Sequence, residues 1–205
     1  MRNDSKEVIF MNKTKGNGAM STNTLVMYAL LTAIVIVLQL MGQFIRFGTF
    51  SVSLVLAPIV IGAALCGPVA GAWLGFVFSV AVLFTDSAPF LAISVPGTII
   101  TVIAKGTLAG LVAGLVYKSL ENKGKSIAVI SAGIVCPIVN TGVFIIGCRL
   151  FFFDTLAEWA QGFGFGDAVW QYIILVLVGG NFIFELVINL ILSSVIVRLI
   201  NMRVK

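Results

Sequence analysis

The side chains of this sequence that are most capable of chemistry gather in one apolar stretch near the C-terminus. Glu185 stands four residues from both Asn181 and Asn189, within Asn181-Phe-Ile-Phe-Glu185-Leu-Val-Ile-Asn189. On an α-helix this spacing places the three side chains on one face, with a drift of about 40° per step. A carboxylate at bilayer depth costs about 2.5–3.5 kcal/mol to insert, so it normally faces a partner, a cavity or a ligand. The stretch is therefore predicted to form one wall of a binding site.

Polar side chains in other apolar segments extend this candidate site. Lys105 and Asn140 stand inside long apolar runs, and Gln43 and Arg46 stand at the expected outer end of the first run. Two roles are open for Lys105 and Glu185. They can form a buried ion pair that fixes helix packing, or they can bind a substrate carboxylate at Lys105 and a hydroxyl or amine at Glu185. The asparagines can equally make hydrogen bonds between helices. The candidate substrate-binding residues are Asn181, Glu185, Asn189, Lys105, Asn140, Arg46 and Gln43.

Composition argues against several kinds of chemistry. The 205 residues include no histidine, which excludes Ser-His and Cys-His catalysis and histidine-bound metals or haem. Cys66, Cys136 and Cys148 show no CxxC spacing and are interpreted as packing residues. We therefore expect no catalytic residue, no metal site and no cofactor. The net charge of +5 is interpreted as a consequence of membrane topology, not as a signal for nucleic-acid binding.

Composition also places the chain in a membrane. Hydrophobic residues make up 60% of the sequence and charged residues 10%, whereas a soluble domain carries about 25% charged residues. We expect a polar cytoplasmic tail at residues 1–23, followed at 24–205 by an all-α integral membrane domain, a bundle of six transmembrane helices. The expected spans are about 24–42, 50–66, 68–85, 93–117, 126–149 and 170–198, each close to the 20 residues that a bilayer requires.

The basic residues predict the orientation of this bundle. With the N-terminus inside, ten of the thirteen Lys and Arg fall on the inner face. The positive-inside rule then puts both termini in the cytoplasm of a multi-pass protein of the cell membrane. The aromatic loop at 151–168 is expected at headgroup depth on the outer face.

Small residues recur at four-residue spacing in three of the segments. Gly67, Gly71 and Gly75 form one such series, and Gly106, Gly110 and Gly114 another; both favour close helix packing inside the bundle. A shorter pair, Ala29 and Ala33, stands near the cytoplasmic end of the first span, where a partner protein could dock.

Taken with the topology, three segments give the chain a specific resemblance. They are Tyr28-Ala-Leu-Leu-Thr-Ala33, Gly62-Ala-Ala-Leu-Cys-Gly-Pro-Val-Ala-Gly-Ala72 and Lys105-Gly-Thr-Leu-Ala-Gly-Leu-Val-Ala-Gly-Leu115. From about Thr24 onward the chain resembles the S-component of energy-coupling factor (ECF) transporters, the substrate-binding subunit of vitamin importers.

This resemblance implies a mechanism. An S-component binds a vitamin from outside and docks on a transmembrane coupling subunit that carries two ATPases. It then topples in the membrane to deliver its substrate inward. By resemblance, Ala29 and Ala33 would form the docking strip, and the loop from Asp86 to Leu91 would cover the site. The chain has no GxxxxGK[ST] motif, so it is not expected to hydrolyse ATP through a P-loop itself. Pantothenate is the first expected substrate, because it is small, anionic and rich in hydroxyl and amide groups; folate and riboflavin follow.

Three other functions compete with this interpretation. An intramembrane enzyme would need Ser-His, paired aspartates or clustered metal-binding aspartates, and none of the spans carries such a set. A stand-alone, ion-coupled secondary transporter would normally show internal repeats. A structural or regulatory subunit without a ligand would not need the polar stripe around Glu185.

Overall fold

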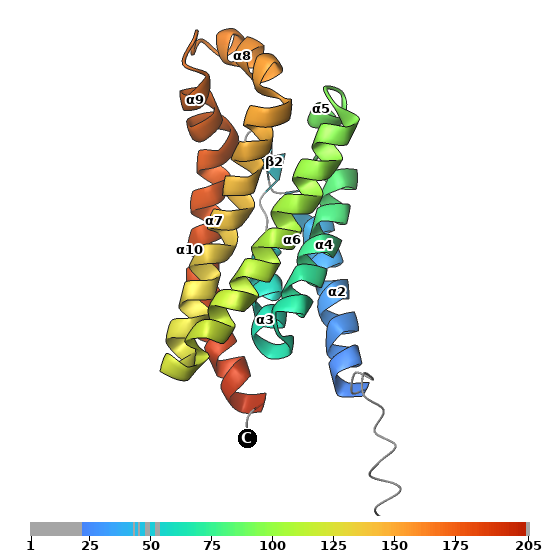
Figure 1. Ribbon diagram of the computed structural model, residues 1–205, viewed down its shortest axis with the longest axis vertical. Coiled ribbons are helices and arrows are strands. Elements are labelled where there is room, and N and C mark those ends of the chain that lie inside the picture. The colour runs from blue at the N-terminus through green and yellow to red at the C-terminus, as the bar shows by residue number, and fades with distance from the viewer. Residues whose placement is uncertain (1–21, 43, 45, 48–49, 52–53, 204–205) are drawn as a thin grey trace, which may run out of the picture.

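The computed structural model describes residues 22–42, 44, 46–47, 50–51 and 54–203. Almost all of them are helical (Figure 1). The helices are α2 (Thr22–Gly42), α3 (Leu56–Cys66), α4 (Pro68–Thr85), α5 (Ala88–Leu91), α6 (Val95–Leu120), α7 (Lys125–Phe151), α8 (Phe153–Gly162), α9 (Val169–Tyr172) and α10 (Gly179–Arg203). Two-residue strands β1 (Arg46–Phe47) and β2 (Phe50–Ser51) pair antiparallel, a 3-10 turn η1 (Glu121–Lys123) joins α6 to α7, and a π-helix η2 (Ile173–Val178) joins α9 to α10.

Five helical segments of the described chain are long and apolar enough to cross a membrane. They run over Thr22–Gly42, Pro68–Thr85, Val95–Lys123, Lys125–Phe151 and Val169–Leu192. The prediction of an all-α, multi-pass membrane protein is therefore confirmed. In Figure 1 the first residues of α2 and the last residues of α10 lie at the same end of the bundle, opposite α5 and α8.

The expected second span is the main point at which the helix bounds differ from the prediction. Helix α3 covers only Leu56–Cys66, and its eleven residues extend about 16 Å, roughly half of the hydrocarbon thickness of a bilayer. The first part of the apolar run at 50–66 instead contributes strand β2, which pairs with β1 through Arg46 opposite Ser51. An apolar run long enough to span is therefore divided here between a strand and a half-length helix.

Glycines bring α4 and α6 into backbone contact. A Cβ atom added to Gly71 would collide with the carbonyl oxygen of Gly110, and one added to Gly75 would collide with that of Gly106. Such small residues at four-residue spacing let two membrane helices approach until their backbones touch. The close approach fixes Phe78 and Ser79 of α4 against the segment of α6 that carries Lys105, because a Cβ at Gly106 would meet both side chains.

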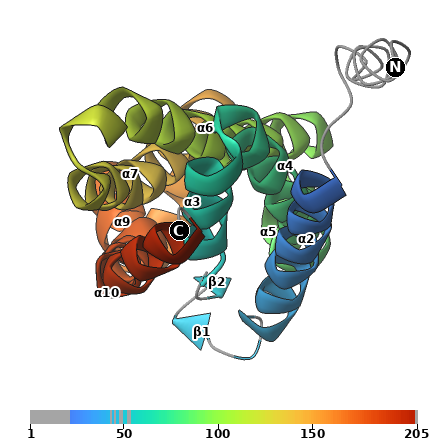
Figure 2. The ribbon, with the colours of Figure 1, turned by 90° about the horizontal axis from the view of Figure 1, so that it is seen from below.

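The buried apolar side chains form two clusters. One joins α2, α3, α4, α6 and α7 and includes Val35, Ile59 and Leu74. The other lies towards α8 and includes Phe90, Phe152 and Tyr172. Cys136 and Cys148 are buried free thiols, and Cys66 is half-buried and free, so the three cysteines pack as expected. Seen from below in Figure 2, α2 and α10 lie on opposite sides of β1 and β2.

The π-helix η2 changes the direction in which the side chains of the last membrane helix point. Along a pure α-helix, residues four apart drift by about 40° per step, which would turn Ile173 and Glu185 towards different neighbours. A π turn holds more residues than an α turn and offsets much of this drift. Ile173, Leu177, Glu185 and Asn189 are all buried as a result, along one continuous face of η2 and α10.

Candidate functional site

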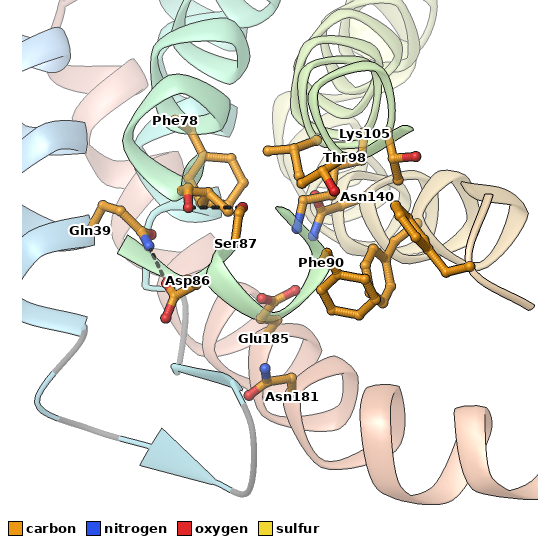
Figure 3. Close-up of a pocket in the computed structure, with 15 residues that line it drawn as sticks. Gln39, Phe78, Asp86, Ser87, Phe90, Thr98, Lys105, Asn140, Asn181 and Glu185 are labelled. Atoms are coloured by element: carbon orange, nitrogen blue, oxygen red, sulfur yellow. Dashed lines mark hydrogen bonds between the residues drawn. The ribbon is translucent and has the colours of Figure 1, made fainter. Parts of the chain in front are cut away.

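A cavity of about 60 Å³ lies inside the bundle and is lined by polar side chains from α2, α6, α7, α10 and the turn between α4 and α5 (Figure 3). A second cavity of about 60 Å³ adjoins it and shares Lys105, Asn140, Phe144, Asn181 and Glu185. The first cavity is lined by Gln39, Phe78, Val82, Asp86, Ser87, Phe90, Thr98, Thr101, Val102, Lys105, Asn140, Phe144, Phe152, Asn181 and Glu185.

Lys105 brings a cationic group to this cavity from α6. Its Nζ atom lies 5.2 Å from the ring centre of Phe144 and 6.0 Å from that of Phe78. A ring face attracts a cation at such distances, so the two aromatic side chains stabilise the ammonium group without using its N–H donors. Lys105 lines both cavities, so a ligand bound there could accept hydrogen bonds from it.

Glu185 faces Lys105 across the same space. Only 6% of its surface is exposed, and the charge of Lys105 acts on its carboxylate, which also receives a hydrogen bond from Asn140. No direct ion pair joins Lys105 to Glu185 in the described part of the chain. The two opposite charges thus line a cavity without a direct ion pair. Burying charged groups in this way costs desolvation energy, unless a third group binds to both of them.

Some buried polar atoms of Asn140 and Thr101, which line the cavity, have no hydrogen-bond partner among the described residues. They are Oδ1 of Asn140 and Oγ1 of Thr101, which lies one helical turn before Lys105 on α6. Because the Asn140 amide donates to Glu185, its oxygen is left as an acceptor. A buried polar atom without a partner costs about 1–3 kcal/mol. A bound molecule that donates a hydrogen bond to this oxygen would remove that cost.

A hydrogen-bond network closes the side of the cavity formed by α2. Gln39, 2% exposed, donates through Nε2 to Oδ2 of Asp86 at 2.9 Å and to Oγ1 of Thr85 at 3.0 Å. Thr85 also donates to Oδ2 of Asp86, at 3.0 Å. The next residue, Ser87, donates to the carbonyl oxygen of Val82 at 3.1 Å. These contacts fix the end of α4 and the position of the Asp86 carboxylate.

Phe90 covers the cavity from the short helix α5. Its ring packs edge-on against Phe144 and Phe152, with ring centres 5.5 Å and 5.0 Å apart, and lies 6.0 Å from Trp159 of α8. Ser94 caps the start of α6 by accepting a hydrogen bond from the backbone N–H of Gly97 at 3.2 Å. The turn between α4 and α6 is therefore packed and capped at both ends.

The structure brings four of the seven predicted site residues to one cavity. Lys105, Asn140, Asn181 and Glu185 line it from α6, α7 and α10. Asn189 is 2% exposed but does not line either cavity with them. Gln43 and the side chain of Arg46 lie outside the described residues.

Several lining residues were absent from the predicted set. Gln39, Ser87, Thr98 and Thr101 contribute polar atoms, and Phe78 and Phe144 contribute rings. Gln39 offered a signal, since it is a lone amide among apolar residues four positions after Val35, on the buried face of α2. The threonines and the serine offered no such signal, because these residue types are common in membrane helices that bind no ligand. Among the described residues, no three His, Cys, Asp or Glu side chains meet in a group that could hold a metal ion.

Comparison with known proteins assigns the family. The family model for the ECF transporter, substrate-specific component, matches residues 23–200, which cover the described helices that line the cavity apart from Thr22 of α2 and the last three residues of α10. A comparison with curated proteins finds none that matches. With its apolar helices and its internal polar cavity, the chain belongs to the family of substrate-specific components of ECF transporters, membrane subunits that bind the substrate and associate with an energising module.

Proposed function

We propose that this chain captures a vitamin or a related micronutrient from outside the cell in the cavity between Lys105 and Glu185. The observation that supports this most is the separation of two opposite charges by a polar cavity, next to an unpaired acceptor on Asn140. A purely structural ion pair would bring the charged atoms together. A cavity that holds them apart is suited to a ligand with complementary ends.

The polar groups define the substrate that we propose. An acidic group would bind the Nζ of Lys105, and hydroxyl or amine groups would donate to Glu185 and to Oδ1 of Asn140. Pantothenate offers a carboxylate at one end and two hydroxyl groups at the other. Folate and riboflavin are larger molecules and follow pantothenate as candidates. Asn181 is proposed to contact the same substrate, and Arg46 and Gln43 remain proposed contacts on the outer side.

Delivery would depend on other subunits. We propose that a transmembrane coupling subunit with two ATPases docks on α2 at Ala29 and Ala33. Both side chains are exposed in the structure, beside the exposed Leu25, Val26 and Leu30. Both termini would lie in the cytoplasm of the cell, which puts α5 and α8 at the outer face.

The substrate proposal is tested with a matched pair of ligands. The full chain, purified in detergent, is titrated calorimetrically with pantothenate and with its alcohol analogue, in which CH₂OH replaces the carboxylate. Pantothenate should bind, and the analogue should bind at least about tenfold more weakly, because it cannot pair with Lys105. Equal affinity for the two would contradict the role of Lys105. Binding of folate or riboflavin without pantothenate would contradict the substrate.

Ion-coupled secondary transport is the second candidate, because Glu185 is a buried carboxylate that faces a cavity. Uptake into proteoliposomes that contain this chain alone, driven by a proton or sodium gradient, would support it. Uptake only when the coupling subunit and ATPases are present with ATP would support the proposed function.

A further inference from the structure

The π-helix η2 decides which way the polar side chains of α10 point. Ile173, at its start, and Glu185, beyond its end, are both buried on the same side of the segment. An α-helix turns by about 100° per residue, so along a pure α-helix the two side chains would diverge by about 120°. A π turn closes its hydrogen bond one residue later than an α turn, which takes up about 100° of that angle.

Gly179 follows η2 directly and is the residue at which the π turn closes. Its φ of −59° and ψ of −48° are ordinary helical values, so the backbone conformation alone does not require glycine. Space does, because an added Cβ would lie 2.6 Å from the carbonyl oxygen of Ile174, a backbone atom that cannot turn aside. Ile174 is five residues earlier, so this close approach belongs to the π turn. At the neighbouring Gly180, an added Cβ would meet no atom of the described chain within 4 Å.

This turn adjoins the candidate site. Leu177 and Val178 of η2 line the second cavity. Asn181 and Glu185 follow Gly179 on α10 and line both cavities (Figure 3). π turns inside α-helices are frequent at functional sites, where they redirect side chains.

The part of the segment before η2 is held by aromatic packing. The ring of Tyr172 lies 5.4 Å from that of Phe163 and 5.8 Å from that of Phe165, and Tyr172 is only 1% exposed. If η2 closed as an α turn, the rotation would therefore be taken up by α10 and not by the outer part of the segment.

We propose that Gly179 is a positioning residue, whose missing Cβ lets η2 close as a π turn and so directs Asn181 and Glu185 into the cavity. The inference rests on the proposed function, in which these two side chains contact the substrate. A side chain at position 179 would favour an α turn in place of η2. Helix α10 would then rotate by about 100°, and its polar side chains would leave the cavity.

Two adjacent glycines provide the first experiment, measured by calorimetry with pantothenate and the full chain in detergent. Gly179→Ala should weaken binding by about tenfold or more, because the hydrogen bonds from Asn181 and Glu185 are misdirected. Gly180→Ala should leave the affinity within about twofold of the wild type. Both variants gain the same helix propensity and differ in the contact with Ile174. Equal affinity in the two variants would overturn the proposal.

A rescue distinguishes misdirected side chains from a general loss of stability. Leu175 is an exposed residue of η2, and its deletion removes the extra residue of the π turn. The turn can then close as an α turn without rotating α10, so deleting Leu175 from Gly179→Ala should restore pantothenate affinity to within about threefold of the wild type. If Gly179→Ala acted only by destabilising the fold, the deletion would add to the damage, and affinity would fall further.

A second measurement needs no ligand and therefore separates this inference from the substrate proposal. Ile183 is 62% exposed and lies on the face of α10 away from Glu185. A nitroxide on Ile183→Cys, in a Cys66→Ala background because the other two cysteines are buried, is placed in lipid nanodiscs. Its accessibility to dissolved oxygen should fall in Gly179→Ala, as α10 turns this position towards the bundle, and stay unchanged in Gly180→Ala.

Unchanged accessibility in Gly179→Ala would overturn the inference, whether or not pantothenate binds. If accessibility falls as expected but the wild type does not bind pantothenate, the substrate proposal fails and the role of Gly179 in directing α10 stands.

Discussion

At the scale of single residues, the site depends on charges that are buried but not directly paired. Lys105 is stabilised by the rings of Phe144 and Phe78, and Glu185 by the amide of Asn140. Each charged group thus has a neutral partner that lowers the cost of burial while leaving hydrogen-bonding capacity towards the cavity. This division of roles explains how the two groups can coexist in a membrane helix bundle without a direct ion pair.

Removing the positive charge should abolish tight binding of an acidic substrate. Lys105→Met keeps the length of the side chain and its contacts with the two rings but loses the ammonium group. We expect at least about tenfold weaker binding of pantothenate, with an unchanged helical circular dichroism spectrum. Lys118→Met is the matched control, because Lys118 is exposed at the other end of α6. Equal binding by Lys105→Met and the wild type would contradict the assigned anchor.

Neutralising the carboxylate of Glu185 on α10 should also weaken substrate binding, because a hydrogen-bond acceptor is lost. Glu185→Gln preserves shape but replaces one acceptor oxygen by an N–H donor, which cannot accept from a substrate hydroxyl or amine. Affinity should fall by about tenfold, the effect of losing a hydrogen bond to a charged group, whereas thermal stability without ligand should hold or rise. A fall in stability with unchanged affinity would make Glu185 a structural residue.

At the scale of elements, the site depends on how closely α4 and α6 approach and on the direction of α10. The glycines of α4 and α6 were predicted to pack, and they do so backbone to backbone. The polar stripe of Asn181, Glu185 and Asn189 was predicted from a regular α-helix. The π-helix η2 was not, since a local widening of one turn leaves no periodic pattern in a uniformly apolar segment such as Ile173–Val178.

The glycine contact gives a prediction about stability. Gly110→Ala should lower the melting temperature of the protein in detergent, because the added methyl group would collide with the backbone oxygen of Gly71, which cannot turn aside. Overpacking of this kind costs about 1–3 kcal/mol. Gly142→Ala in α7 is the control; its Cβ would meet nothing within 4 Å, and alanine favours a helix by about 1 kcal/mol over glycine. The contact would be disproved if both variants melted at the same temperature.

The sequence indicated the polar residues that meet at the cavity better than it indicated the boundaries of the second segment. A charged or amide side chain inside an apolar run is conspicuous, so Lys105, Asn140, Asn181 and Glu185 were singled out without a structure. That they bind the substrate stays a prediction. The apolar run at 50–66 was misleading because hydropathy does not distinguish β2 and the half-length α3 from one full span. Gln39 was absent from the predicted set, and its hydrogen bond to Asp86, 47 positions away, is a contact that no local pattern indicates.

At the scale of the whole molecule, the cavity that we propose for the substrate and the surface that we propose for the coupling subunit lie on different faces of helix α2. Helix α2 buries only one face, through Leu31, Val35, Gln39 and Gly42, and much of the remainder is exposed and apolar. The cavity lies on the buried side of this helix. Membership of the ECF substrate-specific family implies association with an energising module, and α2 is the helix on which we propose that it docks.

Mutations should therefore separate docking of the coupling subunit from binding of the substrate. Ala33→Trp adds bulk to the exposed face of α2, so it should reduce the amount of coupling subunit that copurifies with this chain and lower uptake. Pantothenate affinity of the isolated chain should stay within about twofold, because Ala33 lies outside the cavity. Ile138→Trp, at an exposed position of α7, is the control for introducing tryptophan at a lipid-facing site. If both variants lost the coupling subunit to the same extent, the proposal that Ala29 and Ala33 form the docking strip would be contradicted.

The most direct test of the central claim, that the cavity between Lys105 and Glu185 binds the transported substrate, is to identify what the purified chain retains. The wild type and the variants Lys105→Met and Glu185→Gln are purified in a mild detergent and analysed by mass spectrometry for bound small molecules. We expect one acidic micronutrient, in a ratio near one per wild-type chain, and its loss from both variants. The same molecule bound equally to all three proteins would contradict the assignment of the site.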